Sequence, residues 1–197
     1  MDILFIHIPK AAGTTVEEVF CNHLFSMSYR RGGKFGPLLP FDRENKCSPQ
    51  HMHAELLEKH FHHRSFAQTF CVVRNPLERF ISEFKFRCET HDIAKAGLNA
   101  FAEQVLAQYP DNPFLLDNHI RPQTEFIWRD CKVFKLEDGL DKMFAQLAAT
   151  LGIALQPDSK RFMLSKKAAI EPLTAVNRAR LIAFYQQDFE TFGYALP

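Results

Sequence analysis

The chain has 197 residues, a length typical of one domain with a substantial hydrophobic core. Its 24 basic residues nearly balance its 23 acidic ones, which excludes the broad positive field of a protein that binds nucleic acid or an anionic membrane. Five cysteines without paired spacing, no signal peptide and no apolar run of about 18 residues predict a cytoplasmic protein with reduced thiols and no transmembrane segment.

The predicted elements alternate between strands and helices along the chain. Strands are predicted at 2–8, 66–73 and 131–136. Helices are predicted at 13–25, 52–61, 76–86, 98–108, 139–150 and 174–192, and a long surface loop at 28–50. This alternation predicts a single α/β domain over residues 1–197, with a central parallel sheet between two helix layers in a three-layer α/β/α arrangement.

Two of these helices carry boundary signals. Asn75 is a good N-cap before Pro76, and Glu78 stands at the position of a capping box. Thr174 is the predicted N-cap of the last helix, and Gly193 is its predicted stop.

The first loop, "PKAAGTT" at residues 9–15, follows a strand and opens a helix. At the carboxyl edge of a parallel sheet, the N–H groups of Gly13, Thr14 and Thr15 would point at an anion beside the cation Lys10. Unlike the usual nucleotide-binding loop, this one places its lysine before the glycine. The alternative is an ordinary turn with a capping threonine.

The second loop, at the end of the next strand, is a second candidate anion site. Arg74 ends that strand, and Ser82 lies eight residues later on a helix whose apolar stripe faces elsewhere. An arginine fork with a nearby hydroxyl is suited to binding a phosphate. The alternative role for Arg74 is a salt bridge to Glu78.

Together the two loops resemble those of the sulfotransferases that use 3′-phosphoadenosine 5′-phosphosulfate (PAPS), within the carbohydrate branch that includes heparan-sulfate 2-O and chondroitin/dermatan 4-O enzymes. The resemblance rests on Pro-Lys-x-x-Gly-Thr-Thr and on Arg-Asn-Pro-x-x-Arg-x-x-Ser-x-Phe. The stretches "DNHIRPQTEF", "VFKLEDGLDKMF" and "YQQDFETFGY" are also similar to segments of that branch. The resemblance implies a sulfotransferase fold, which is similar to the fold of P-loop NTPases.

The resemblance also implies roles for individual residues. The first loop would hold the 5′ phosphate and the sulfate through Pro9, Lys10, Ala11, Ala12, Gly13, Thr14 and Thr15. Arg74 and Ser82 would hold the 3′ phosphate. Lys10 corresponds to the lysine at the bridging oxygen, where negative charge develops during transfer. No metal takes part. Lys166, in a segment where relatives often close over the nucleotide, is a further donor-binding candidate.

The acceptor would be a hydroxyl that needs a general base. The pair His51 and His53 lies between the two loops, as in the heparan-sulfate 2-O branch. By that match His53 is the expected base and His51 its supporter, while His119 is the rival. The short chain favours a carbohydrate, a glycolipid head group or another small molecule as acceptor.

Functions from other classes remain alternatives. A P-loop kinase using ATP would need Gly-Lys-Ser/Thr and an acidic residue that ends an apolar strand, and neither occurs. A metal-binding module could use Cys47, His51 and His53, although structural zinc normally takes four ligands. A catalytically inactive nucleotide-binding protein is the third alternative.

Overall fold

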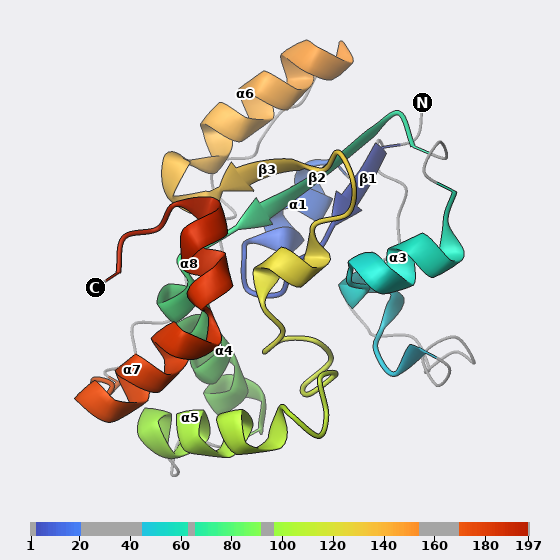
Figure 1. Cartoon of the computed structure of the whole chain (residues 1–197). Helices are drawn as coiled ribbons and strands as arrows, with labels where there is room; N and C mark the ends of the chain where they lie inside the picture. Colours follow the sequence, from blue (N-terminus) through green and yellow to red (C-terminus); the bar gives the residue numbers. More distant parts are fainter. Residues whose placement is uncertain (1–2, 21–44, 63–65, 92–96, 154–169, 197) are drawn as a thin grey trace.

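The structure, a computed structural model, describes residues 3–20, 45–62, 66–91, 97–153 and 170–196 (Figure 1). Its sheet has three parallel strands in the order β1 (Ile3–Ile6), β2 (Gln68–Val73) and β3 (Lys132–Lys135). The predicted α/β class and parallel sheet are confirmed, and β2 is central. The full three-layer arrangement stays a prediction.

Helices follow each strand, as the alternation predicts. The α-helices are α1 (Gly13–Val19), α3 (Ala54–His60), α4 (Pro76–His91), α5 (Gly97–Gln108), α6 (Leu140–Leu151), α7 (Ala175–Phe184) and α8 (Gln186–Phe192). Short 3-10 helices are η1 (Pro49–His51), η4 (Gln123–Phe126) and η5 (Leu136–Asp138). Over the described ranges, no helix is long and apolar enough to cross a membrane.

The first hydrophobic core surrounds the sheet. All four residues of β1 are buried, because both faces of this strand are covered. The Phe70 ring of β2 packs against Phe5 and Phe20, with ring centroids 5.1 and 5.5 Å away. The strand register pairs Ile6 with Cys71 and Val73 with Lys135, so the carboxyl ends of the strands meet at one edge of the sheet.

A second core lies beyond that edge, where α4, α5, α7 and α8 pack together (Figure 1). The predicted apolar stripe of α4 is Leu77, Phe80, Ile81 and Phe84; Leu77, Phe80 and Phe84 belong to this core, and the partly buried Ile81 packs against it. The Phe101 ring of α5 lies 5.4 Å from Phe80 and 5.6 Å from Phe84, measured between centroids. The stripe turns the polar face of α4 toward the carboxyl ends of the strands.

Two predicted segments differ from the structure. The last helix, predicted as one element at 174–192, is divided at Tyr185 into α7 and α8. The buried Tyr185 hydroxyl donates to Ile120 O at 2.8 Å, which anchors the chain at this break. The end of the predicted surface loop at 28–50 is also wrong, because Asn45, Cys47 and Pro49 are buried and η1 begins at Pro49.

The capping predictions are confirmed in part. Asn75 Oδ1 accepts from the N–H groups of Leu77 and Glu78, and the Thr174 side chain accepts from Asn177 N. The capping box is wrong, because the Asn75 N–H donates to Glu137 Oε1 at 2.7 Å and not to Glu78. The 3-10 helix η5, which follows β3, therefore supplies the carboxylate that the sequence assigns to α4.

The C-terminal helix α8 holds the segment after His119 through one buried carboxylate. Asp188, fully buried, accepts from Gln123 N at 2.8 Å and from Thr124 N and Oγ1 at 2.9 and 3.0 Å. Gln123 in turn accepts from Arg74 N and donates to Arg74 O. Asp188 thus fixes the end of β2 through one intermediate side chain.

We expect Asp188→Ala to lower the free energy of unfolding by about 2–4 kcal/mol, because it leaves buried donors of Gln123 and Thr124 without an acceptor. Urea unfolding measures this change. The matched control is Glu190→Ala on the same helix, where an exposed contact to Gln186 is lost; its effect should stay within about 0.5 kcal/mol. A loss below about 1 kcal/mol for Asp188→Ala would contradict the anchoring role.

Candidate functional site

The first loop adopts a strained backbone between β1 and α1. Lys10 and Ala12 have φ angles of 66° and 63°, in the left-handed region that residues with a Cβ rarely adopt. Along the described chain, the N–H groups of Gly13 and Thr14 donate to no backbone acceptor, whereas Thr15 N donates to Ala12 O at 3.1 Å. The capping-threonine alternative fails here, because Ala12 is the N-cap and no side chain caps α1.

Gly13 is required by the close approach of a buried histidine. A Cβ at position 13 would lie 2.2 Å from His7 Nε2. His7 Nδ1 lies 2.8 Å from Glu17 Oε1, and Gln50 Nε2 donates to both Glu17 oxygens at 3.1 Å. Burial opposes ionisation of Glu17, but the contacts from His7 and Gln50 lower its pKa. These contacts join the first loop to η1, which carries His51.

The second predicted phosphate site lies at the end of β2. Arg74 has a side chain that is 26% exposed, and its Nη2 lies 3.6 Å from Glu78 Oε2. That contact is the predicted salt bridge, but it is long and its carboxylate is 59% exposed, so it contributes little stability. Ser82 on α4 is half-buried, and its hydroxyl has no hydrogen-bond partner among the residues that the structure places. Lys166 lies outside the described residues.

His51 is paired with a carboxylate that lies 66 residues away. Its Nδ1 donates to Asp117 Oδ2 at 2.7 Å, since an ionised carboxylate only accepts. Asp117 also accepts from Ser48 N and Ser48 Oγ. Burial opposes ionisation of Asp117, but the hydrogen bonds and charge of His51 and the hydrogen bonds of Ser48 lower the pKa of Asp117 to about 2. The arrangement leaves Nε2 of His51 as the nitrogen that can take a proton.

His119 is paired in the same way on the other side of the site. Its Nδ1 donates to Glu83 Oε2 at 2.6 Å, and Glu83 Oε1 accepts from Arg87 Nε at 2.6 Å. Burial lowers the pKa of His119 to about 4, although Glu83 opposes this shift. Arg87 balances the charge of Glu83, so His119 is a neutral imidazole at pH 7 with an unprotonated Nε2.

His53 has a different environment from the other two candidates. It is the N-cap residue of α3, is 4% exposed, and packs its ring edge-on against Phe114. Its Nε2 lies 3.6 Å from Glu55, and its buried Nδ1 has no hydrogen-bond partner among the described residues. Burial and the nearby Arg121 lower its pKa to about 4.

One aromatic ring, Phe86 of α4, links the first loop to the histidines. Lys10 Nζ lies 4.2 Å from the centroid of the Phe86 ring, and the His119 ring stacks on Phe86 at 6.0 Å. The His51 ring lies 4.8 Å from His119. Burial lowers the pKa of Lys10, although the Glu83 carboxylate opposes the shift. The structure thus brings Lys10, His119 and His51 together; the contacts of His53 run to Phe114 and Glu55.

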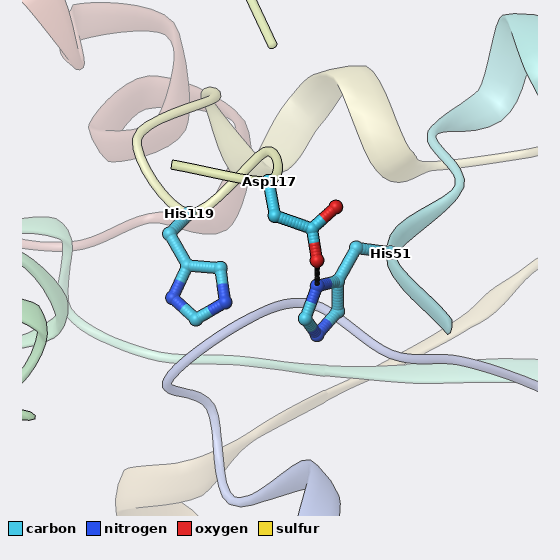
Figure 2. A group of neighbouring side chains, drawn as sticks. All are labelled: His51, Asp117 and His119. Carbon is cyan, nitrogen blue, oxygen red and sulfur yellow. Dashed lines mark hydrogen bonds and ion pairs between the residues drawn. The ribbon is translucent and has the colours of Figure 1, made fainter. Parts of the chain in front are cut away.

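His51, Asp117 and His119 are also the described residues best placed to hold a metal ion, with one ligand atom each within 4.8 Å of the others. Figure 2 shows the Nδ1 of His51 directed at the Asp117 carboxylate. Asp117 already accepts three hydrogen bonds, and a metal bound through Nδ1 of His51 would have to displace its proton. The geometry is therefore that of a hydrogen-bonded histidine. Cys47 and His53, expected in the metal-module alternative, are not part of this group.

A left-handed turn presents Asp117 and His119 to His51. Leu116, Asp117 and Asn118 have φ angles of 55°, 59° and 64°. The buried Asn118 donates to His51 O at 2.9 Å and accepts from Arg121 Nε at 2.9 Å, which locks the turn against η1.

The carboxylates of the site, Asp117, Glu83 and Glu17, were not among the residues predicted from the sequence. Asp117 is two residues from His119 in the "DNHIRPQTEF" stretch, so its proximity in sequence was a signal. Glu83 and Arg87 show the i, i+4 spacing of a helical ion pair on the polar face of α4. Glu17 and Gln50 carried no such signal, because only the fold brings them to His7.

Comparison with known proteins gives one family. A family model described as "Sulfotransferase family" matches residues 1–195. No curated protein and no solved structure matches the chain significantly.

The lowered pKa values predict how stability depends on pH. His53 and His119 stay uncharged in the folded protein down to about pH 4, whereas in the unfolded chain they bind protons near pH 6.5. The free energy of unfolding should therefore fall as pH falls from 6.5 to 4, by about 1 kcal/mol for each histidine and about 2 kcal/mol in total between pH 6 and 5. Glu83, with a pKa of about 2, adds its own loss only below its unfolded value of 4.5.

Urea unfolding at several pH values measures this slope. His53→Gln should reduce the slope to the part that His119 contributes, and the double substitution with His119→Gln should flatten it. Constant stability between pH 6.5 and 4.5 in the unsubstituted protein would show that these histidines titrate normally in the fold.

Proposed function

Because this chain belongs to the sulfotransferase family, we propose that it transfers a sulfuryl group from PAPS to a hydroxyl of a carbohydrate or similar small acceptor. The observation that carries the proposal is the shared contact of Lys10 and His119 with the Phe86 ring. It brings a cation of the first loop next to a histidine that is paired for proton transfer, at the carboxyl edge of the sheet.

The donor would lie across the two loops. The free N–H groups of Gly13 and Thr14, together with Lys10, suit the 5′ phosphate and sulfate. Arg74 and the Ser82 hydroxyl suit the 3′ phosphate, because the weak contact to Glu78 is easily replaced by a charge-assisted bond to phosphate.

The proposed step is an in-line displacement at sulfur. The bond from the acceptor oxygen to sulfur forms while the bond from sulfur to the phosphate oxygen breaks. The electron pair of the broken bond stays on the phosphate oxygen beside Lys10, and the proton of the acceptor hydroxyl passes to a histidine. Neither the bond cleavage nor the proton transfer requires a metal ion, since Lys10 supplies the cation beside the leaving oxygen.

We place His119 as the base and His51 as its supporting neighbour. His119 is neutral at pH 7, its Nδ1 is held by Glu83, and it contacts the same ring as Lys10. The sequence favoured His53, whose buried and unpartnered Nδ1 keeps it as the alternative base. We also propose that the acceptor is a glycan, a glycolipid head group or another small alcohol. Membership of the carbohydrate branch of the family is part of the same proposal.

Donor binding is the direct test of the proposed function. Calorimetry should show that 3′-phosphoadenosine 5′-phosphate binds more tightly than AMP or ATP, because only the 3′ phosphate satisfies Arg74. Arg74→Ala should weaken this binding by about 2–4 kcal/mol, and Ser82→Ala by about 1 kcal/mol. Equal affinity for AMP and the bisphosphate would reject PAPS as the donor.

The base is identified by comparing three variants for sulfate release from PAPS, with water as the acceptor. His119→Ala should bind donor normally but react about 10² or more times slower, because proton transfer is lost. His51→Ala should be milder, and His53→Ala should keep most of the rate. The rate of the unsubstituted protein should fall only as pH approaches the His119 pKa of about 4. A full loss in His53→Ala with an active His119→Ala would return the role to His53.

A further inference from the structure

One charged residue of the second motif, Arg79, has no part in donor binding or proton transfer as proposed. It lies on α4, is 1% exposed, and is among the largest fully buried side chains of the described residues. Its guanidinium lies over the Tyr185 ring, with Cζ 5.3 Å from the centroid. A cation this deeply buried needs an explanation, because desolvating it costs several kcal/mol.

Arg79 donates to backbone carbonyls from two separate parts of the site. Its Nη1 lies 2.9 Å from His119 O and 3.5 Å from Pro9 O, and its Nη2 lies 2.7 Å from Arg121 O. Pro9 precedes Lys10 directly. One planar group therefore touches both the loop that carries the cation and the backbone of the proposed base.

No carboxylate of the described chain lies within ion-pair distance of Arg79. The guanidinium groups of Arg74, Arg87 and Arg121 each have a carboxylate partner within 4 Å. A buried charge whose direct partners are backbone carbonyls is a poor source of stability compared with an apolar side chain of similar volume. Its rigid fork of donors instead fixes direction and separation.

We propose that Arg79 is a positioning residue for sulfuryl transfer, which sets the separation between Lys10 and His119. This inference rests on the proposed function. The bridging oxygen beside Lys10, the sulfur, the acceptor oxygen and the base must lie in one geometry, and an error of about 1 Å can cost about 10²-fold in rate. A lysine at position 79 would keep the charge but could not hold three carbonyls in a plane.

A double-mutant cycle separates positioning from stability. The single-turnover rate of sulfate release from labelled PAPS, with water as acceptor, is measured for Arg79→Lys alone and combined with Lys10→Ala or His119→Ala. Alone, Arg79→Lys should slow the reaction about 30–100-fold while the affinity for 3′-phosphoadenosine 5′-phosphate changes less than about threefold. In either combined background its effect should drop below about tenfold, because one of the aligned groups is already missing.

Two further variants control for folding. Asn177→Ala removes part-buried hydrogen bonds to Asn99 and Glu103 at the opposite end of α7 from Tyr185, and should destabilise the protein with less than about a threefold change in rate. If Arg79→Lys does not fold, Tyr185→Leu replaces it; this variant removes the ring beneath the guanidinium and also the hydroxyl bond to Ile120 O, so Tyr185→Phe, which loses only the hydroxyl bond, is its control. Tyr185→Leu should slow the reaction about 5–10-fold relative to Tyr185→Phe, again less in the Lys10→Ala background.

The outcomes distinguish a failure of the positioning role of Arg79 from a failure of the proposed function. Equal losses for Arg79→Lys in all backgrounds, or a rate within about threefold of the unsubstituted protein, would overturn the positioning role alone. An equal rate loss in Asn177→Ala would also overturn it, since stability would then explain the effect. If the unsubstituted protein neither prefers the bisphosphate nor releases sulfate, the proposed function and this inference both fail.

Discussion

The site depends on three consecutive left-handed residues, Leu116 to Asn118. For residues with a Cβ this conformation costs about 1–2 kcal/mol each, less for Asp and Asn, so surrounding contacts must enforce it. Asn118 supplies the main ones, because its buried amide bridges His51 O and the Arg121 side chain. The strained turn is what brings Asp117 onto His51 and His119 beside it. Without it, the two histidines would lack both their spacing and one of their carboxylates.

The same segment couples distant parts of the chain. Just after the turn, the carbonyls of His119 and Arg121 accept from Arg79 of α4, and Gln123 bonds both backbone groups of Arg74. Asp188 of α8 holds Gln123 in turn. The C-terminal helix is therefore not only a cover for the second core. It fixes the carboxyl end of β2, where the proposed 3′ phosphate site lies.

The charged groups around His119 and around Lys10 differ. Burial lowers the pKa of His119 and keeps its imidazole neutral, while Arg87 balances part of the opposing charge of Glu83, which stands between them. Lys10 is partly desolvated by burial, which strengthens its interaction with any anion that enters the loop. A neutral imidazole and a lysine that contact the same ring are the arrangement on which the proposed sulfuryl transfer relies.

The sequence by itself determined the parallel α/β sheet, the apolar stripe of α4 and the loop that carries Lys10. These features depend on local periodicity and turn chemistry, which neighbouring residues encode. The sequence also indicated the family, because the residues of the short motifs are close together in the chain and their spacing is visible in the sequence. Only the tertiary structure decided which histidines share the site and which carboxylates hold them. Glu17, Glu83 and Asp117 reach His7, His119 and His51 across 10 to 66 residues, and no local pattern records such a contact. The break at Tyr185 has the same cause, because a buried hydroxyl bound to Ile120 O overrides a continuous helical pattern.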